Sequence, residues 1–380
     1  MKQAGSFRAL LALAVLLSAR LLSAQPPDPD FTEEITVALS TVTVRVVDAL
    51  GNPVTGLGPE DFRVRVGRRE IPVAGVDWFS SETERPQPAP LESAAEPGPA
   101  EAPQPIGQRA GQLVVFFVQA DLNPTRISGQ LRLRPYTREL LDRLHPEDRV
   151  AVVSYDSHLK LWQDFTRDRE AVYAALDRAM VWSTEGEPEA AAGEISLVAG
   201  FDAAAARRAA SPEKALEVTA RALSPLPGEK SIVYLGWGLG RYTSWGVQMT
   251  PDYAPAVQAL TAAHVSVFVL DVTSADFHSL EVGLQGVAAA TGGTYAKTNV
   301  LPGLATDSLV RTLTGFYVLT FDQGEIAGAE GAVRIDLRQK KGTVLVRPIS
   351  VRDKLSLEGH GTNSRRSKKN RLPRPTPFPP

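Results

Sequence analysis

The histidines of this 380-residue chain do not form a catalytic or metal-binding pattern. Their spacing matches no metal-ligand motif. They are His145, His158, His264, His278 and His360. Cysteine is absent, which excludes thiol nucleophiles, thiolate metal sites and disulfides. The sequence also lacks the Gly-x-Ser-x-Gly elbow of hydrolases and a phosphate-binding Walker loop. We therefore expect a protein that is not an enzyme.

A glycine-rich loop follows an apolar run in the second half of the chain. Its Gly236-x-Gly238-x-Gly240 pattern is like a dinucleotide-binding loop, but it continues into Arg-Tyr-Thr-Ser and does not open a helix. That continuation argues against a dinucleotide site. The same loop carries Trp237, Tyr242 and Trp245. These aromatic side chains are expected either to anchor a partner protein or to pack beneath the loop as a small satellite core.

The elements that must position these residues alternate between strands and helices from residue 112 to about 314. Leu113 to Val118 is a continuous apolar run, typical of a central parallel strand that is covered on both faces. Val150–Tyr155, Ser231–Leu235 and Val265–Leu270 are further short apolar runs, with helical periodicities between them. This alternation predicts an α/β fold with a doubly wound, mostly parallel sheet.

Short β segments flank the α/β region. Residues 31–80 and 315–352 both alternate apolar and polar side chains, as half-buried strands do. Each segment has too few strands to close a core alone. We therefore expect the N- and C-terminal strands to form one small β-sandwich, with the α/β domain of residues 112–314 inserted between them. Residues 81–111 are rich in Pro, Ala and Glu and are expected to be a disordered linker.

The two ends of the chain predict export and a basic tail. Lys2 and Arg8 precede an apolar core, and a small residue precedes Gln25, so residues 1–24 are predicted to be the signal peptide of a secreted or periplasmic protein. No later segment is long enough to span a membrane. Residues 353–380 form a basic, proline-rich, disordered tail that either solubilises the chain or contacts an anionic surface. The net charge of −2 gives no reason to expect a nucleic-acid partner.

Taken in order, these segments resemble a von Willebrand factor type A domain, and specifically the exported type A-related family of acidobacteria. Val114–Val118, Arg149–Tyr155 and Val265–Asp271 are similar to strands of that domain. The upstream residues Val54–Phe62 resemble the strand-turn signature that precedes it in this family. The resemblance covers roughly residues 31–350. It implies a ligand-binding rim beyond the carboxyl ends of the strands.

Most such domains bind their ligands through a magnesium ion. The resemblance implies an Asp-x-Ser-x-Ser motif after the first strand, a Thr in a later loop and an Asp that ends the fourth strand. Here the motif is Gln119-x-Asp121-x-Asn123, Trp237 stands where that last Asp is usual, and Thr184 is the candidate for the loop Thr. One carboxylate with two amides is expected to hold Mg²⁺ poorly. We therefore predict a degenerate metal-ion-dependent adhesion site and no cofactor.

Two uses remain open for the polar residues of the rim. Asp121 and Asn123 are metal ligands if a residual site persists, and loop-capping residues if it does not. Asp271 is expected to line the rim or to cap the loop that follows it. The predicted rim comprises Gln119, Asp121, Asn123, Thr184, Trp237, Tyr242, Trp245 and Asp271. We expect it to bind a protein partner; the alternatives are a structural component of the cell envelope and metal-dependent adhesion through a non-standard site.

Overall fold

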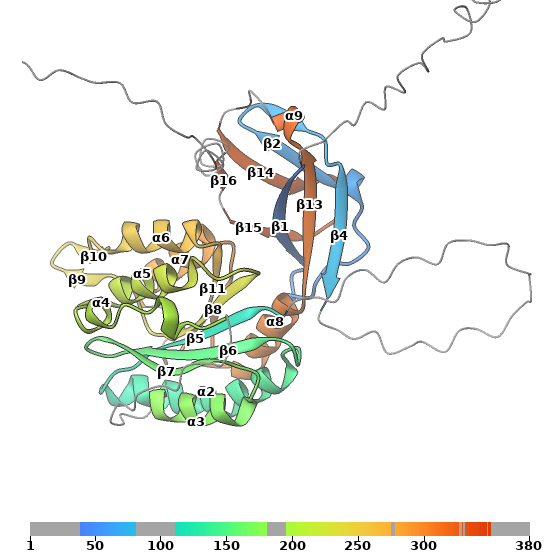
Figure 1. The fold of residues 1–380 in the computed structure, drawn as a ribbon. Helices are drawn as coiled ribbons and strands as arrows, with labels where there is room; N and C mark the ends of the chain where they lie inside the picture. Colours follow the sequence, from blue (N-terminus) through green and yellow to red (C-terminus); the bar gives the residue numbers. More distant parts are fainter. Residues whose placement is uncertain are drawn as a thin grey trace, which may run out of the picture. The chain divides into compact units, whose positions relative to one another are not determined.

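The computed structural model describes residues 39–80, 111–180, 195–274, 278–326, 329, 331–347 and 349–350. A six-stranded sheet forms the core of its α/β part (Figure 1). The strand order is β12-β11-β8-β5-β6-β7, and all neighbours are parallel except the edge pair β6–β7. The strands are β5 (Leu113–Gln119), β6 (Arg149–Tyr155), β7 (Leu159–Thr166), β8 (Lys230–Gly236), β11 (Val265–Asp271) and β12 (Tyr295–Lys297). The predicted mostly parallel sheet is confirmed.

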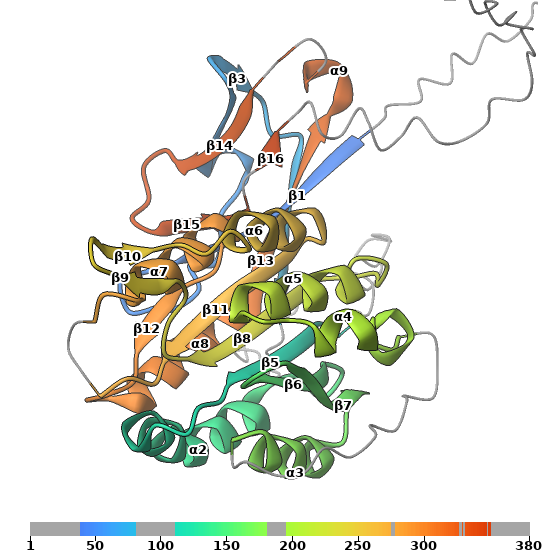
Figure 2. The same ribbon diagram turned by 90° about the vertical axis from the view of Figure 1, so that its left-hand side faces the viewer.

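Helices cover both faces of this sheet (Figure 2). They are α2 (Pro124–Arg143), α3 (Arg169–Met180), α4 (Ala203–Arg207), α5 (Pro212–Leu223), α6 (Tyr253–Ala262), α7 (Glu281–Ala290) and α8 (Pro302–Thr314). Successive β5 residues face opposite layers, as the period of two requires. Phe117 packs in the core that contains Leu216 of α5, whereas Phe116 packs in the core that contains Leu140 of α2. The predicted doubly wound arrangement is confirmed.

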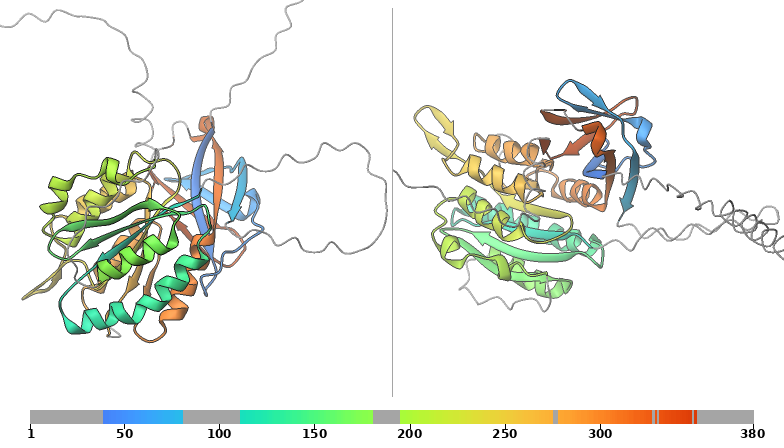
Figure 3. Two further views of the ribbon diagram at one scale, coloured as in Figure 1. Left: turned by 60° about the horizontal axis from the view of Figure 1, so that its bottom comes forward. Right: turned by 45° about the horizontal axis from the view of Figure 1, so that its top comes forward.

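The flanking β segments pair with each other across the sequence (Figure 3). In the described residues one sheet has the order β15-β1-β13-β4 and a second has the order β16-β14-β2-β3. The strands are β1 (Leu39–Val47), β2 (Phe62–Val66), β3 (Arg69–Ile71), β4 (Gly75–Ser80), β13 (Gly315–Asp322), β14 (Ala332–Leu337), β15 (Thr343–Val346) and β16 (Ile349–Ser350). Val44, Phe62 and Leu319 share one buried cluster. The predicted sandwich of N- and C-terminal strands is confirmed.

A buried ion pair connects β1 to the segments that lead into β5 and β8. The Arg45 guanidinium, 3% exposed, donates to Glu229 at 3.1 Å and to the Gln112 side chain at 3.2 Å. Arg347 donates to the same Glu229 oxygen at 3.3 Å. Burial alone would raise the pKa of Glu229, but the two guanidinium groups outweigh it and lower that pKa. The carboxylate is therefore kept charged where these segments meet.

Some local structure differs from the periodicity in the sequence. The alanine-rich stretch of residues 203–223 forms two helices and not one, because Ser211 caps a new helix that starts at Pro212. A hairpin of β9 (Arg241–Thr243) and β10 (Gly246–Gln248) was not predicted, since its exposed residues show no apolar alternation. The described residues also contain two short 3₁₀ helices, η1 (Pro59–Asp61) and η2 (Val198–Gly200), and the four-residue helix α9 (Gln323–Ile326).

Several predicted segments lie outside the described residues. They are the signal peptide 1–24, the linker except Gly111, the basic tail 353–380, and Thr184. Among the helices that the structure does describe, none combines the length and the apolar character needed to cross a bilayer.

Candidate functional site

The carboxyl ends of β5, β8 and β11 meet at one edge of the sheet. Gln119 ends β5, Trp237 follows the end of β8 and Asp271 ends β11. Because the three strands are parallel neighbours, these residues lie along the same rim. The structure thus brings together three of the residues that the sequence proposed for the rim.

Gln119 holds the loop after β8 by both ends of its side-chain amide. The side chain is 1% exposed, and its Oε1 accepts from the backbone N–H of Trp237 at 2.9 Å and of Gly238 at 3.1 Å. Its Nε2 donates to the carbonyl of Gly238 at 2.9 Å. A carboxylate could accept the two backbone hydrogen bonds but could not donate the third. The amide at this position therefore has a structural explanation.

Asp121 and Asn123 both hydrogen-bond within the loop that starts α2. Asp121 Oδ1 accepts from the backbone N–H of Asn123 at 3.0 Å. Asn123 is the N-cap of α2, where its Oδ1 accepts from the Thr125 backbone N–H at 3.0 Å and from the Thr125 hydroxyl at 2.6 Å. Pro124 at the first helical position suits the same helix start. Both residues thus cap the loop.

Arg126 supplies a positive charge that the sequence analysis overlooked. Its Nη1 donates to the second carboxylate oxygen of Asp121, and its guanidinium lies over the Trp237 ring, 3.4 Å from the ring centroid. The carboxylate balances the charge of the guanidinium, and the indole ring makes a cation–π contact with its planar face. The one available signal was a basic residue three positions after the helix cap, which is common on any helix.

As these side chains lie, they do not offer Mg²⁺ the oxygen set that it requires. Mg²⁺ takes near-octahedral oxygen ligands, including one or two carboxylates. The oxygens of Gln119 and Asn123 accept from backbone N–H groups, and Asp121 is divided between a backbone N–H and Arg126. Trp237 contributes no oxygen in place of the usual Asp. The described part of the rim therefore does not fit the ion that the resemblance implies.

An open cavity of about 280 Å³ lies beside Arg126. It is lined by Thr125, Arg126, Trp237, Tyr242, Thr273, Ser274, His278 and Leu280. The lining combines aromatic faces, hydroxyl groups, one guanidinium and one imidazole, all of which can contact a polar or charged group of a partner.

The two outer aromatic residues of the glycine-rich loop do not form a satellite core. Tyr242 and Trp245 belong to the β9–β10 hairpin, and they are 61% and 96% exposed. The hairpin projects from the neighbouring elements in the right-hand view of Figure 3. Only Trp237 is half-buried, against Arg126. The interpretation in which all three pack under the loop is therefore wrong for Tyr242 and Trp245, because the hairpin holds them in solvent.

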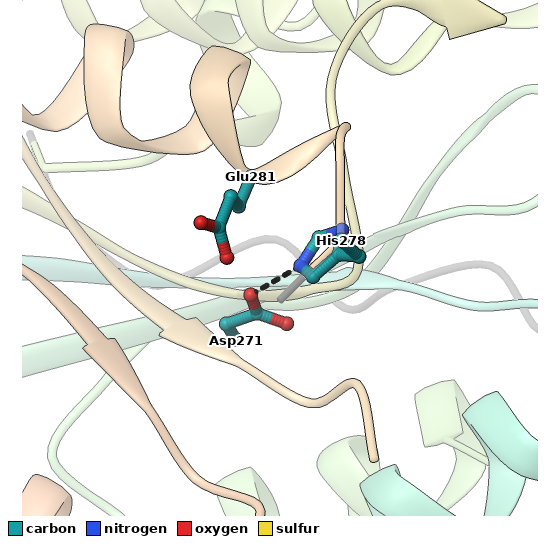
Figure 4. Close-up of side chains that lie close together, drawn as sticks. All are labelled: Asp271, His278 and Glu281. Carbon is teal, nitrogen blue, oxygen red and sulfur yellow. Dashed lines mark hydrogen bonds and ion pairs between the residues drawn. The ribbon is translucent and has the colours of Figure 1, made fainter. Parts of the chain in front are cut away.

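Asp271 is surrounded by donors at the end of β11. It is fully buried, and its Oδ1 accepts from the backbone N–H of Thr273 at 3.0 Å and from the Thr273 hydroxyl at 2.8 Å, so it caps the following loop. Its Oδ2 lies 2.6 Å from His278 Nε2 and accepts from the Tyr295 hydroxyl at 2.6 Å. Glu281, at the start of α7, lies beside Asp271 and His278 (Figure 4). Its carboxylate pairs with Lys297 at 2.7 Å.

Sequence reasoning missed His278 and Glu281. It treated the histidines as scattered, although His278-x-x-Glu281 has a spacing that places both side chains on one side of a helix start. Burial alone would raise the pKa of Glu281, but Lys297 outweighs it and lowers that pKa. Burial, and then the hydrogen bond to Asp271, raise the pKa of the Tyr295 hydroxyl. These two shifts keep the Glu281 carboxylate charged and the Tyr295 phenol protonated.

Comparisons with known proteins give structural likenesses only. No family model matches the sequence, and no curated protein matches it. A von Willebrand factor type A protein from Catenulispora acidiphila has 11% identity and a TM-score of 0.38 over 83% of this chain and 73% of that one. An aerotolerance-related membrane protein from Bacteroides fragilis has 12% identity and a TM-score of 0.37 over 53% and 98%.

A mutant of the PilB minor pilin from Streptococcus sanguinis is also similar, with 13% identity and a TM-score of 0.38. The match covers 56% of this chain and 63% of the pilin chain, so it spans less than two thirds of the pilin's length. TM-scores of this size carry no argument about the fold, which is described by the strand order and the layers given above.

Proposed function

We propose that this chain is an exported, non-enzymatic protein that binds a partner protein at the rim of its von Willebrand factor A-like domain without a magnesium ion. The observation that carries the proposal is the β9–β10 hairpin, which holds Trp245 at 96% and Tyr242 at 61% exposure. Tyr242 also lines the rim cavity. Exposed aromatic residues beside a polar cavity are typical anchors of protein interfaces.

In this proposal the Arg126 guanidinium supplies the positive charge that Mg²⁺ would supply in a metal-ion-dependent adhesion site. The guanidinium has five N–H groups, and one of those on Nη1 donates to Asp121. We propose that the remaining donors face an acidic side chain of the partner, while Trp237 keeps the guanidinium plane fixed. The degenerate metal site is thus an exchange of a bound ion for a built-in charge.

Export and family membership belong to the same proposal. The predicted signal peptide supports a secreted or periplasmic protein. The order of strand motifs and the upstream strand-turn signature support membership of the exported type A-related family of acidobacteria. A rim without the usual metal ligands does not argue against that membership, because one fold can carry different sites.

Site-specific photo-crosslinking in the native cell envelope tests the proposal. A photo-reactive phenylalanine analogue in place of Trp245 should give a discrete covalent adduct with one protein. The matched control carries the analogue at Leu50, which is 71% exposed on the β-sandwich and should give no such adduct. Adducts of equal yield from both positions would contradict a specific docking surface.

The identified partner then allows a direct affinity measurement. Trp245→Ala should weaken binding by at least about tenfold, because an exposed aromatic anchor contributes chiefly to the complex. Its effect on the free energy of unfolding should stay within about 0.5 kcal/mol, as for other exposed surface changes. Added Mg²⁺ should leave the affinity unchanged. A partner that binds only in the presence of Mg²⁺ would contradict the proposal.

A further inference from the structure

Asp271, His278 and Glu281 converge on one point at the end of β11 (Figure 4). One ligand atom from each residue lies within 4.8 Å of the other two. The set is an imidazole nitrogen with two carboxylate oxygens, which is a composition that suits borderline divalent transition ions more than Mg²⁺ or Ca²⁺. We propose that these three residues form a binding site for a divalent transition ion such as Zn²⁺, separate from the site that the fold resemblance implies.

The surroundings of Asp271 fix the carboxylate in a ligand-like orientation. Thr273 holds Oδ1 through its backbone N–H and its hydroxyl, and this leaves Oδ2 as the oxygen that faces His278. Thr298 holds the backbone carbonyl of Asp271 through its N–H at 3.0 Å and its hydroxyl at 2.7 Å. Outer hydrogen bonds of this kind orient the ligands of a metal site before the ion arrives.

Charge gives an independent reason for a cation at this point. Asp271 is fully buried, Glu281 has only 12% of its side chain exposed, and both carboxylates face the same small space. Two carboxylates at this distance need compensating positive charge when they are shielded from water. Lys297 pairs with Glu281 at 2.7 Å, which counters one of the two negative charges. A divalent ion would counter both.

The proposed ligand atoms now contact side chains, and these contacts can be exchanged for an ion without a change of the backbone. His278 Nε2 and Asp271 Oδ2 are at hydrogen-bond distance, so a proton lies between them in the metal-free chain. An ion at Nε2 takes the place of that proton, which moves to Nδ1 or to solvent. Lys297 releases one Glu281 oxygen, and the Tyr295 hydroxyl remains a donor to Asp271. For bonds of about 2.0 Å, His278 Nε2 and Asp271 Oδ2 must move apart from their present 2.6 Å.

The site has a path to solvent. His278 and Thr273 line the rim cavity, and the His278 side chain is 11% exposed. A bound ion would therefore keep one position open toward the cavity and take a water molecule there, which gives four-coordination with three protein ligands.

Titration of the untagged full chain with Co²⁺ tests this proposal, because the visible absorption of Co²⁺ reports the number and type of its ligands. We expect one equivalent of Co²⁺ with the intense bands of low coordination, and displacement of those bands by Zn²⁺. Asp271→Asn and His278→Gln should each weaken Co²⁺ binding by at least about tenfold, since each removes one of three ligands. Zn²⁺ should also raise the unfolding temperature of the wild type but not of these variants.

A second Asp–His pair in the chain provides the matched control. His158 Nδ1 lies 3.9 Å from Asp156 Oδ1, and Lys160 forms an ion pair with Asp156 at 2.7 Å. Within the part of the chain that the structure describes, three potential ligand atoms converge only at the Asp271 group and not at this pair. His158→Gln should therefore leave Co²⁺ binding unchanged.

Three results would overturn the proposal. They are loss of Co²⁺ binding in His158→Gln, its retention in both Asp271→Asn and His278→Gln, and the absence of stoichiometric binding by the wild type. Circular dichroism of each variant separates loss of a ligand from loss of the fold.

Discussion

The ends of β5 and β11 both carry a buried polar side chain, Gln119 and Asp271, but the partners of these two residues differ in kind. Gln119 is bound at both ends of its amide by backbone groups of one loop. Asp271 has one oxygen on Thr273 and the other on the side chains of His278 and Tyr295. Backbone partners cannot leave without unfolding the loop, whereas side-chain partners can rotate away. Whether a strand end can hold an ion therefore depends on whether the hydrogen-bond donors already on its oxygens can be displaced.

The largest effect is expected where the donors are fixed. Gln119→Ala leaves two backbone N–H groups and one carbonyl of the β8–β9 loop without partners, so it should lower the free energy of unfolding by about 2–3 kcal/mol. Urea denaturation measures the change. Gln248→Ala, at an exposed position of β10, is the control and should have almost no effect. A Gln119→Ala protein as stable as the control would show that the loop does not depend on this amide.

A smaller effect on the free energy of unfolding is expected at Tyr295, a side-chain donor to Asp271. Tyr295→Phe removes the hydroxyl that donates to Asp271 at 2.6 Å, and a hydrogen bond to a buried charged group contributes about 1.5 kcal/mol or more. The variant keeps Asp271, His278 and Glu281, so Zn²⁺ should stabilise it as it stabilises the wild type. Thermal unfolding with and without Zn²⁺ measures both effects. A variant that loses stability without any response to Zn²⁺ would break the comparison between the two strand ends.

The first strand end should accept an ion once its built-in cation is removed. In Arg126→Ala combined with Trp237→Asp, Asp121 loses its guanidinium partner and gains a second carboxylate nearby. At ten times the dissociation constant, Mg²⁺ would then stabilise the variant by about 1.4 kcal/mol. Calorimetric unfolding with increasing Mg²⁺ measures the gain, with the Trp237→Asp single variant as control. Equal responses in the single and double variants would show that Arg126 does not exclude the ion.

The smallest effect concerns the pH dependence of Glu281. Its pKa lies below the ordinary value of 4.5 because Lys297 outweighs the effect of burial. A lowered pKa in the folded state stabilises the protein above the ordinary value, and this contribution is lost as the pH falls through the lowered pKa. Glu281→Gln should therefore be less stable than the wild type near neutral pH and should approach it in acid. A constant difference between the two across this pH range would contradict the assignment.

The sequence predicted the layers of the molecule better than its site. Continuous apolar runs such as Leu113–Val118 have few alternatives to a central strand, and the alternating flanks had too few strands to fold apart. The site depends on contacts that no local pattern encodes. Arg126 reaches Asp121 and Trp237 by its place on a helix, and His278 meets Asp271 only after the chain turns between β11 and α7.

The β9–β10 hairpin shows a related limit. None of its strand residues is buried, since all are exposed except the half-buried Thr243 and Val247, so the hairpin has no buried apolar face. Hydrophobic periodicity detects elements that pack against a core, and this hairpin does not. The sequence left open whether Trp245 anchors a partner or packs beneath the loop. Its 96% exposure in the structure excludes packing beneath the loop.

Isothermal titration of the wild-type chain with Mg²⁺ tests the central claim most directly, namely that the first strand end has exchanged a bound ion for Arg126. The account predicts no saturable heat at millimolar Mg²⁺, and the same result for Asp121→Asn. One equivalent of Mg²⁺ bound by the wild type and lost in Asp121→Asn would contradict it.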